Sequence, residues 1–235
     1  MNPPSYRPVQ VWDGTVRLTH WWNAISTLLL LVLGSILYLR DVFKLPDPVK
    51  DTLITVHAAI GFALAAGLAI RIIYLFAEPG KASNWRDILP HTRAQFELAF
   101  RTLRYYAGGF RGKCPLYLAH NPLAGMAYSG FFVFASMQAL TGAAMYLLGD
   151  GATPAYAHEG HFQAPPQTWP PAWLVLIHDV DALLIALFII AHLAALALHD
   201  LVETRGLASS MISGNKFFSD DEIRELEKER PSPGS

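Results

Sequence analysis

The sequence contains a single cysteine, Cys114, among its 235 residues. One cysteine excludes an intramolecular disulfide, and the absence of a Cys-x-x-Cys-His motif excludes covalent attachment of a c-type haem. Charged residues are also scarce, at 16% of the chain, whereas hydrophobic residues make up 52%. This balance is unusual for a soluble domain and gives no indication of nucleic-acid binding. It predicts a membrane protein.

Four long apolar segments use up most of this hydrophobic material. They cover residues 21–39, 53–76, 123–148 and 173–199. At about 1.5 Å per residue, each segment is long enough to cross or nearly cross a hydrocarbon core about 30 Å thick. We therefore predict an all-α fold, a four-helix transmembrane bundle within a domain spanning residues 1–215.

Two further segments lie outside the predicted spans. Residues 85–106 mix aromatic and aliphatic side chains with arginines, which is typical of a helix lying in the membrane interface. Residues 216–235 form a charged tail, which we expect to be loosely ordered.

Lysine and arginine are distributed unevenly among the connections. The connection over residues 78–121 holds seven, the segment after residue 199 holds five, and the N-terminal segment holds two. The connection over residues 149–172 holds none, and the first connection holds three. The positive-inside rule then predicts that both termini and the connection over residues 78–121, with its interfacial helix, are cytoplasmic.

The last apolar segment carries two histidines, His178 and His192, at a spacing of fourteen residues. On an α-helix this spacing returns a side chain to within about 40° of the same face, roughly 21 Å further along the axis. Histidines inside a membrane span are costly and usually functional, and a neutral imidazole is a good axial ligand for haem iron.

Depth in the membrane pairs these histidines with two others. In the predicted orientation, His57 lies near the outer end of its span, at the same depth as His178. His20 lies near the inner end of its span, close to the depth of His192. We predict two non-covalent haems b, stacked along the membrane normal, with these four residues as axial ligands to the iron. Any one of them could instead be a hydrogen-bonded structural residue, but four that pair by depth favour haem. No catalytic nucleophile or acid/base pair is needed for electron transfer.

Other polar residues are weaker candidates. His199 lies seven residues after His192 and is an alternative inner ligand. Arg71 lies fourteen residues after His57, so it could pair with a haem propionate or a quinone oxygen, or else snorkel to the interface. The remaining histidines are interpreted as solvated loop residues, although two of them form a weak H-x-x-H metal pair. They are His91, His120, His158 and His161.

Five stretches of the sequence resemble the b-type cytochrome subunit of membrane-bound nickel-iron hydrogenases. They are VQVWDGTVRLTHWWNAIS, VHAAIGFALAAGLAIRIIY, HNPLAGMAYSGFF, HDVDALLIALFIIAH and SSMISGNKFF. The resemblance implies a subunit in the bacterial inner membrane that anchors the small (iron-sulfur) and large hydrogenase subunits at the outer face. It also implies electron transfer through haem b to quinone, with the family's histidine pattern falling on His20, His57, His178 and His192.

On this reading the chain is an electron-transfer subunit of a complex rather than an enzyme alone. The donor should cover the two outer connections, near Trp169 and Trp173, and quinone should be reduced beside the inner haem. Polar residues at that end could bind quinone or relay protons: Arg71, His120, Asn121, His199 and Asp200. Three alternatives are a formate dehydrogenase-like cytochrome subunit, a stand-alone cytochrome b561-type oxidoreductase and a membrane anchor without haem.

Overall fold

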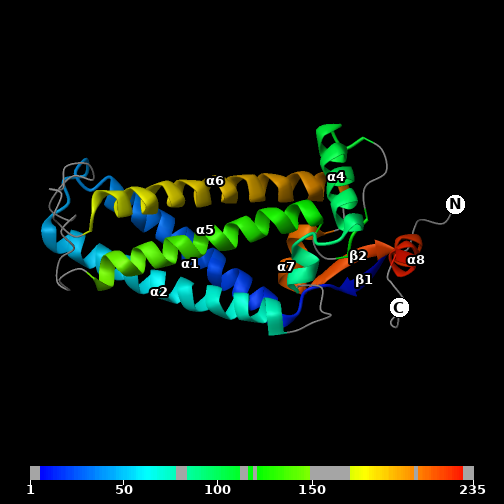
Figure 1. Cartoon of the computed structure of the whole chain (residues 1–235), viewed down its shortest axis with the longest axis horizontal. Helices are drawn as coiled ribbons and strands as arrows, with labels where there is room; N and C mark the ends of the chain where they lie inside the picture. Colours follow the sequence, from blue (N-terminus) through cyan, green and yellow to red (C-terminus); the bar gives the residue numbers. More distant parts are fainter. Residues whose placement is uncertain are drawn as a thin grey trace. The chain divides into compact units, whose positions relative to one another are not determined.

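The computed structural model of the chain describes six stretches of residues. They are 6–77, 84–111, 116–118, 121–148, 170–203 and 206–229. Four long helices dominate them (Figure 1): α1 Gly14–Tyr38, α2 Asp47–Ala77, α5 Pro122–Leu147 and α6 Ala172–Glu203. All four are long and apolar enough to cross a membrane, which confirms the four predicted spans. The chain is a multi-pass membrane protein.

Helix starts differ from the predicted bounds because polar capping residues precede the apolar segments. The carboxylate of Asp13 accepts a hydrogen bond from the Val16 amide at 3.0 Å, so α1 begins at Gly14 rather than residue 21. The side-chain oxygen of Asn121 accepts a bond from the Ala124 amide at 2.6 Å and caps α5. Pro122 then occupies the first helical position, where its missing N–H has no consequence.

The chain divides into two compact units. One unit contains residues 19–71 and 131–190. It holds the greater part of each long helix, with small apolar clusters such as Leu37 with Ile54, and Met145 with Leu174. Many of its large apolar side chains are exposed, which is the pattern of helices whose outer faces contact lipid.

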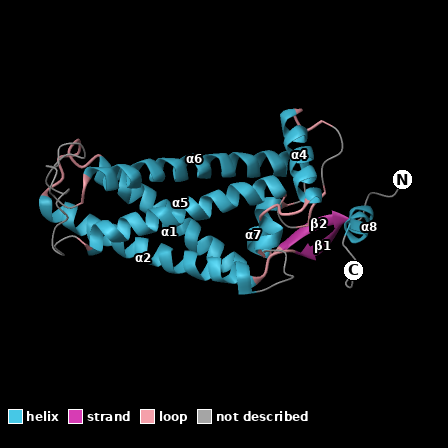
Figure 2. Ribbon diagram, in the orientation of Figure 1, coloured by secondary structure: helices cyan, strands magenta, loops and turns pink. Residues whose placement is uncertain are grey.

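The other unit contains residues 1–18, 72–130 and 191–235. In it, strand β1 (Tyr6–Gln10) pairs antiparallel with β2 (Asn215–Ser219), as Figure 2 shows. Helices α7 (Leu207–Ser213) and α8 (Asp220–Glu229) flank β2 in sequence. The all-α prediction was therefore incomplete, and the expectation of a loosely ordered tail was wrong for residues 216–229.

The ribbon of β1 and β2 lies beside a small core built around Trp12. The Trp12 indole N–H donates to Ser210 Oγ at 3.0 Å, and Lys216 Nζ lies 5.6 Å from the centre of the Trp12 ring. Lys216 also donates to the Leu118 carbonyl at 3.1 Å. These contacts join the two ends of the chain, and they explain why residues close to the C-terminus are ordered.

The helix predicted over residues 85–106 is broken in two. Helix α3 covers Trp85–Ile88 and α4 covers Arg93–Ala107, because Pro90 interrupts the segment between them. Thr92 and Gln95 form a reciprocal capping box that starts α4. At Gly125 on α5, any Cβ would collide with the Ile88 carbonyl, so the close contact between α3 and α5 requires glycine.

Candidate functional site

His57 on α2 and His178 on α6 belong to the same compact unit, and their rings are neighbours in an edge-on arrangement. The ring centroids are 6.3 Å apart and the ring planes are inclined at 65°. Both residues are partly buried. Depth in the membrane predicted that these two residues lie close together, and their side chains are neighbours in the structure. We call them the histidine pair.

His178 is held by polar groups from α5. Its Nδ1 lies 2.9 Å from the Thr141 hydroxyl, which also lies 2.9 Å from the Met137 carbonyl. When the hydroxyl donates to that carbonyl, its oxygen can accept a hydrogen bond from Nδ1–H, and Nε2 is then the basic nitrogen. A histidine that binds metal through Nε2 needs such a partner at Nδ1, so Thr141 suits a ligand role for His178.

Two further residues, Gln138 and Asp181, complete this arrangement, and the sequence analysis did not single them out. Gln138 lies 3.0 Å from His178 Nε2, and in the amide orientation that satisfies its neighbours it donates to Asp181 Oδ2 at 3.0 Å. In that orientation it accepts from His178 only in the other tautomer, with the proton on Nε2 and Nδ1 accepting from the Thr141 hydroxyl. Asp181 is 1% exposed, and its Oδ1 has no hydrogen-bond partner among the residues described. Two sequence features could have identified these residues. Asp181 lies one helical turn after His178, and Gln138 is the only amide side chain in the third apolar segment.

The surroundings of the histidine pair fit a flat prosthetic group. Metal–imidazole bonds are about 2.0 Å long, so two imidazoles on one iron have ring centres roughly 6 Å apart, close to the spacing of the pair. A Cβ at Gly142 would lie 3.1 Å from His178 Cε1, and one at Gly34 would lie 3.4 Å from His57 Cε1. Both rings therefore lie against bare backbone. Ligation through His178 Nε2 would displace its hydrogen bond to Gln138.

Arg71 on α2 belongs to the same unit as the histidine pair. It is fully buried, and its three guanidinium nitrogens have no hydrogen-bond partner among the described residues. Its Cζ lies 5.9 Å from the centre of the Phe132 ring. A buried cation without a counter-ion is strongly unfavourable, so an anion such as a carboxylate would stabilise this position. The snorkelling alternative does not fit a side chain with no exposed surface.

His20 and His192, the other predicted pair, fall in different compact units. His20 is partly buried and lies edge-on to the Trp21 ring, with centroids 5.5 Å apart. His192 is exposed along α6. Their pairing stays a prediction.

A second polar group forms within the other unit. His199 Nε2 on α6 lies 2.6 Å from the Tyr106 hydroxyl on α4, and the Asn121 amide donates to the same hydroxyl at 2.9 Å. His199 and Asn121 are buried, and the Phe110 ring packs against both Tyr106 and His199. We call Tyr106, Asn121 and His199 the tyrosine cluster. The structure thus joins two predicted residues through Tyr106, which nothing in the sequence distinguished from the other aromatic residues of its segment.

The remaining candidates have structural surroundings or lie outside the described residues. Asp200 accepts a hydrogen bond from the Leu207 amide at 2.7 Å and so stabilises the start of α7. His91 is exposed beside the start of α4. No group of three metal-binding side chains occurs in the part of the chain that the structure describes. The following predicted residues lie outside that part: His120, His158, His161 and Trp169.

Four apolar spans that carry an internal histidine pair against bare backbone are the features of a membrane-embedded b-type cytochrome. The chain belongs to the prokaryotic cytochrome b561 family, whose model matches residues 11–214. Membership implies that the protein binds haem and transfers electrons.

Curated relatives extend over nearly the whole chain. A probable Ni/Fe-hydrogenase B-type cytochrome subunit from Bradyrhizobium diazoefficiens is 28% identical over 220 residues, covering 90% of this chain and 87% of the relative. Proteins of the same description from Azotobacter chroococcum and Cupriavidus necator are 27% and 28% identical, each over more than 90% of this chain and 90% of their own length. The resemblance inferred from the five sequence stretches is confirmed.

Proposed function

We propose that the chain anchors a hydrogenase to the bacterial inner membrane and carries its electrons through two haems b to quinone. The observation that carries this proposal is the histidine pair, with ring centroids 6.3 Å apart inside a four-span membrane protein. The similarity to probable Ni/Fe-hydrogenase B-type cytochrome subunits supports hydrogenase as the electron donor.

His57 and His178 would hold the outer haem, and His20 and His192 the inner haem. His199 is the weaker inner candidate because its Nε2 is already 2.6 Å from the Tyr106 hydroxyl. Haem iron supplies reversible one-electron chemistry between the ferric and ferrous states. The protein supplies the remaining requirements: Thr141 orients the His178 ring, Arg71 neutralises a propionate, and apolar helices exclude water.

The tyrosine cluster is the proposed site of quinone reduction. Reducing a quinone consumes two electrons and two protons, so the site needs groups that donate hydrogen bonds and replace protons. The Tyr106 hydroxyl and His199 Nε2 can share a proton across 2.6 Å, and the Asn121 amide holds the hydroxyl in place. Phe110 adds an aromatic wall against which a flat ring can pack.

The donor would bind on the opposite side of the membrane, with both termini of the chain cytoplasmic. Two apolar residues of the first connection, Val42 and Phe43, are 73% and 55% exposed, and Trp173 at the start of α6 is 62% exposed. Exposed aromatic and aliphatic side chains at the end of a span suit a protein partner, because the buried core of a protein interface is apolar and rich in aromatic residues.

Purification in mild detergent, followed by mass spectrometry, tests the choice of donor. We expect the iron-sulfur and large subunits of a hydrogenase to co-purify, and hydrogen to reduce the haem b absorption bands and then added quinone. Co-purification of a molybdenum-containing formate-oxidising subunit, with formate rather than hydrogen as reductant, would contradict the proposal. Rapid haem reduction by a small reductant in the isolated chain, without partners, would favour the stand-alone alternative.

A further inference from the structure

Helix α4 exposes a continuous apolar stripe. Phe96, Phe100 and Leu103 are 55%, 67% and 50% exposed. Their spacing of four and then three residues places them within a sector roughly 60° wide on a helix that turns about 100° per residue. On a helix surrounded by water, such a stripe would favour association with another apolar surface.

The orientation of this stripe is fixed by contacts on the rest of the helix. Ala99, Thr102 and Tyr105 are buried. Tyr106, at the C-terminal end of α4, is hydrogen-bonded to His199 and Asn121, which belong to the same compact unit. The apolar stripe therefore faces away from the packed side of α4 and is not a surface left by a loosely held helix.

A charged row runs beside the stripe, over a neighbouring sector roughly 80° wide. It consists of Arg93, Glu97, Arg101 and Arg104, all exposed. Glu97 pairs with Arg93 at 3.1 Å, so Arg101 and Arg104 carry the excess positive charge.

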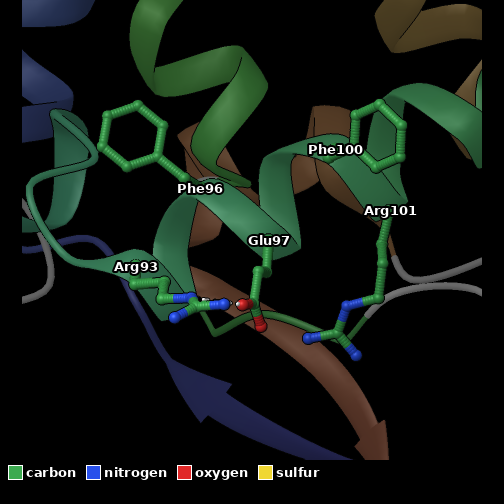
Figure 3. A pocket seen from close by; sticks show the side chains of 5 residues that line it. All are labelled: Arg93, Phe96, Glu97, Phe100 and Arg101. Carbon is green, nitrogen blue, oxygen red and sulfur yellow. Dashed lines mark hydrogen bonds and ion pairs between the residues drawn. The ribbon is translucent and has the colours of Figure 1, made fainter.

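Figure 3 shows the boundary between the two surfaces. The rings of Phe96 and Phe100 lie on one side of α4, and the charged side chains of Arg93, Glu97 and Arg101 point to the other side. These five residues line an open depression of about 660 Å³. The depression thus presents apolar rings along one edge and guanidinium groups along the other.

Helix α4 lies in the same unit as the first residues of α5 and the last residues of α6. Its Tyr106 contacts His199 near the end of α6, and α4 crosses that end instead of continuing along it (Figure 1). A helix that crosses the end of a membrane span lies at the level of the lipid headgroups. Guanidinium groups bind phosphate by paired hydrogen bonds, and acyl chains accept aromatic rings.

We propose that α4 binds an anionic phospholipid, with the apolar stripe against the acyl region and Arg101 and Arg104 against the headgroup phosphate. The occupant is a lipid rather than a protein because the apolar stripe and the cationic row lie side by side, as in amphipathic helices of the membrane interface. The inference rests on the four membrane spans and does not depend on hydrogenase or quinone. It adds a second role to α4, whose packed face supplies Tyr106 to the tyrosine cluster.

Native mass spectrometry of the purified full chain in mild detergent tests this binding site. Phosphatidylglycerol and phosphatidylcholine with the same acyl chains are titrated in parallel. We expect phosphatidylglycerol to bind preferentially. Affinity for it should fall about fivefold in Arg101→Gln and about 25-fold in the Arg101→Gln, Arg104→Gln double variant. The reason is that each basic residue near an anionic lipid surface raises affinity about fivefold. Phe100→Ser should also weaken phosphatidylglycerol binding.

Arg7→Gln is the matched control, because Arg7 is an exposed arginine of the same unit that pairs with Asp220 on α8. It should leave phosphatidylglycerol affinity unchanged. Equal weakening by Arg7→Gln and Arg101→Gln would overturn the proposal, since general charge would then explain binding. Equal affinity for the two lipids would also overturn the proposal. So would a dimer of the chain that dissociates in the Phe100→Ser variant, because the apolar stripe would then bind a second copy of the chain.

Discussion

The histidine pair and the tyrosine cluster are built in different ways. His57 and His178 both lie within apolar spans, and the residues around them also come from spans: Thr141, Gln138 and Asp181. The tyrosine cluster takes Tyr106 from α4, Asn121 from the residue that caps α5, and His199 from the end of α6. The first arrangement suits a cofactor that is held permanently in an apolar interior. The second offers exchangeable hydrogen bonds at the end of the spans, which suits a substrate that enters and leaves.

The largest expected effect is loss of haem from variants of the histidine pair. His57→Ala and His178→Ala should each remove one haem and leave the other, because an axial ligand to a non-covalent haem cannot be replaced by a methyl group. His20→Ala should remove the other haem. The pyridine haemochrome assay measures the ratio of haem to chain.

His91→Ala is the control for these variants, since His91 is exposed and should keep the full haem content. If His57→Ala abolished both haems while the protein stayed folded, or if His57→Ala and His178→Ala removed different haems, the pairing would be wrong.

The next largest effect concerns Arg71. Removing one partner of a buried ion pair costs about 3–5 kcal/mol, so Arg71→Leu should weaken haem retention by a factor of roughly a hundred or more. In the haem-free protein the same change removes an uncompensated buried charge, so thermal stability should stay level or rise. Thermal unfolding of the haem-loaded and haem-free protein distinguishes the two cases. Parallel destabilisation of both forms would show that Arg71 is structural.

A smaller and more selective effect is expected in the tyrosine cluster. Tyr106→Phe keeps the ring and removes the hydroxyl, so quinone reduction should fall by roughly a factor of a hundred, as expected when a proton-transfer group is lost. Reduction of both haems by the donor should stay normal, because the block lies after them. Stopped-flow absorbance separates these two steps.

Tyr105→Phe is the neighbouring control and should reduce quinone at the normal rate. Asn121→Ala and His199→Ala should resemble Tyr106→Phe. Normal quinone reduction in all three cluster variants would place the quinone elsewhere.

The smallest expected effect involves Asp181. Its negatively charged carboxylate should stabilise the oxidised, more positive state of the haem proposed between His57 and His178. Asp181→Asn should therefore raise the reduction potential of that haem. For a unit charge roughly 10 Å away at an effective dielectric constant of 20, the change is on the order of 50 mV. Asparagine can still accept from Gln138, so haem content should not change. A redox titration that shows no shift, with both haems present, would assign Asp181 a role in packing alone.

The difference between the two sites also explains what the sequence could predict. The four spans follow from hydrophobic length, which acts along a single helix. The pairing of His57 with His178 follows from the depth of each histidine in its span, once the distribution of lysine and arginine has oriented the spans. Asn121 was selected only as a polar residue near a membrane boundary, and His199 for that reason and as an alternative inner haem ligand. Their link through Tyr106 depends on where α4 packs, and no periodicity in the sequence encodes that contact.

Other features were missed for similar reasons. The pairing of β1 with β2 joins residues about 200 positions apart, and each strand is only five residues long. Such short strands carry too little alternation to be recognised. Residues 220–229 were assigned to a loosely ordered tail because they are charged, but their acidic first turn favours a helix start.

The central claim is that the four histidines hold two haems, one of them between His57 and His178. It is tested most directly by the ratio of haem to chain in the purified wild-type protein, from pyridine haemochrome absorbance and quantitative amino-acid analysis. The account predicts two acid-acetone-extractable haems b per chain, falling to one in His57→Ala. A ratio of one in the wild type that is unchanged in His57→Ala would contradict it.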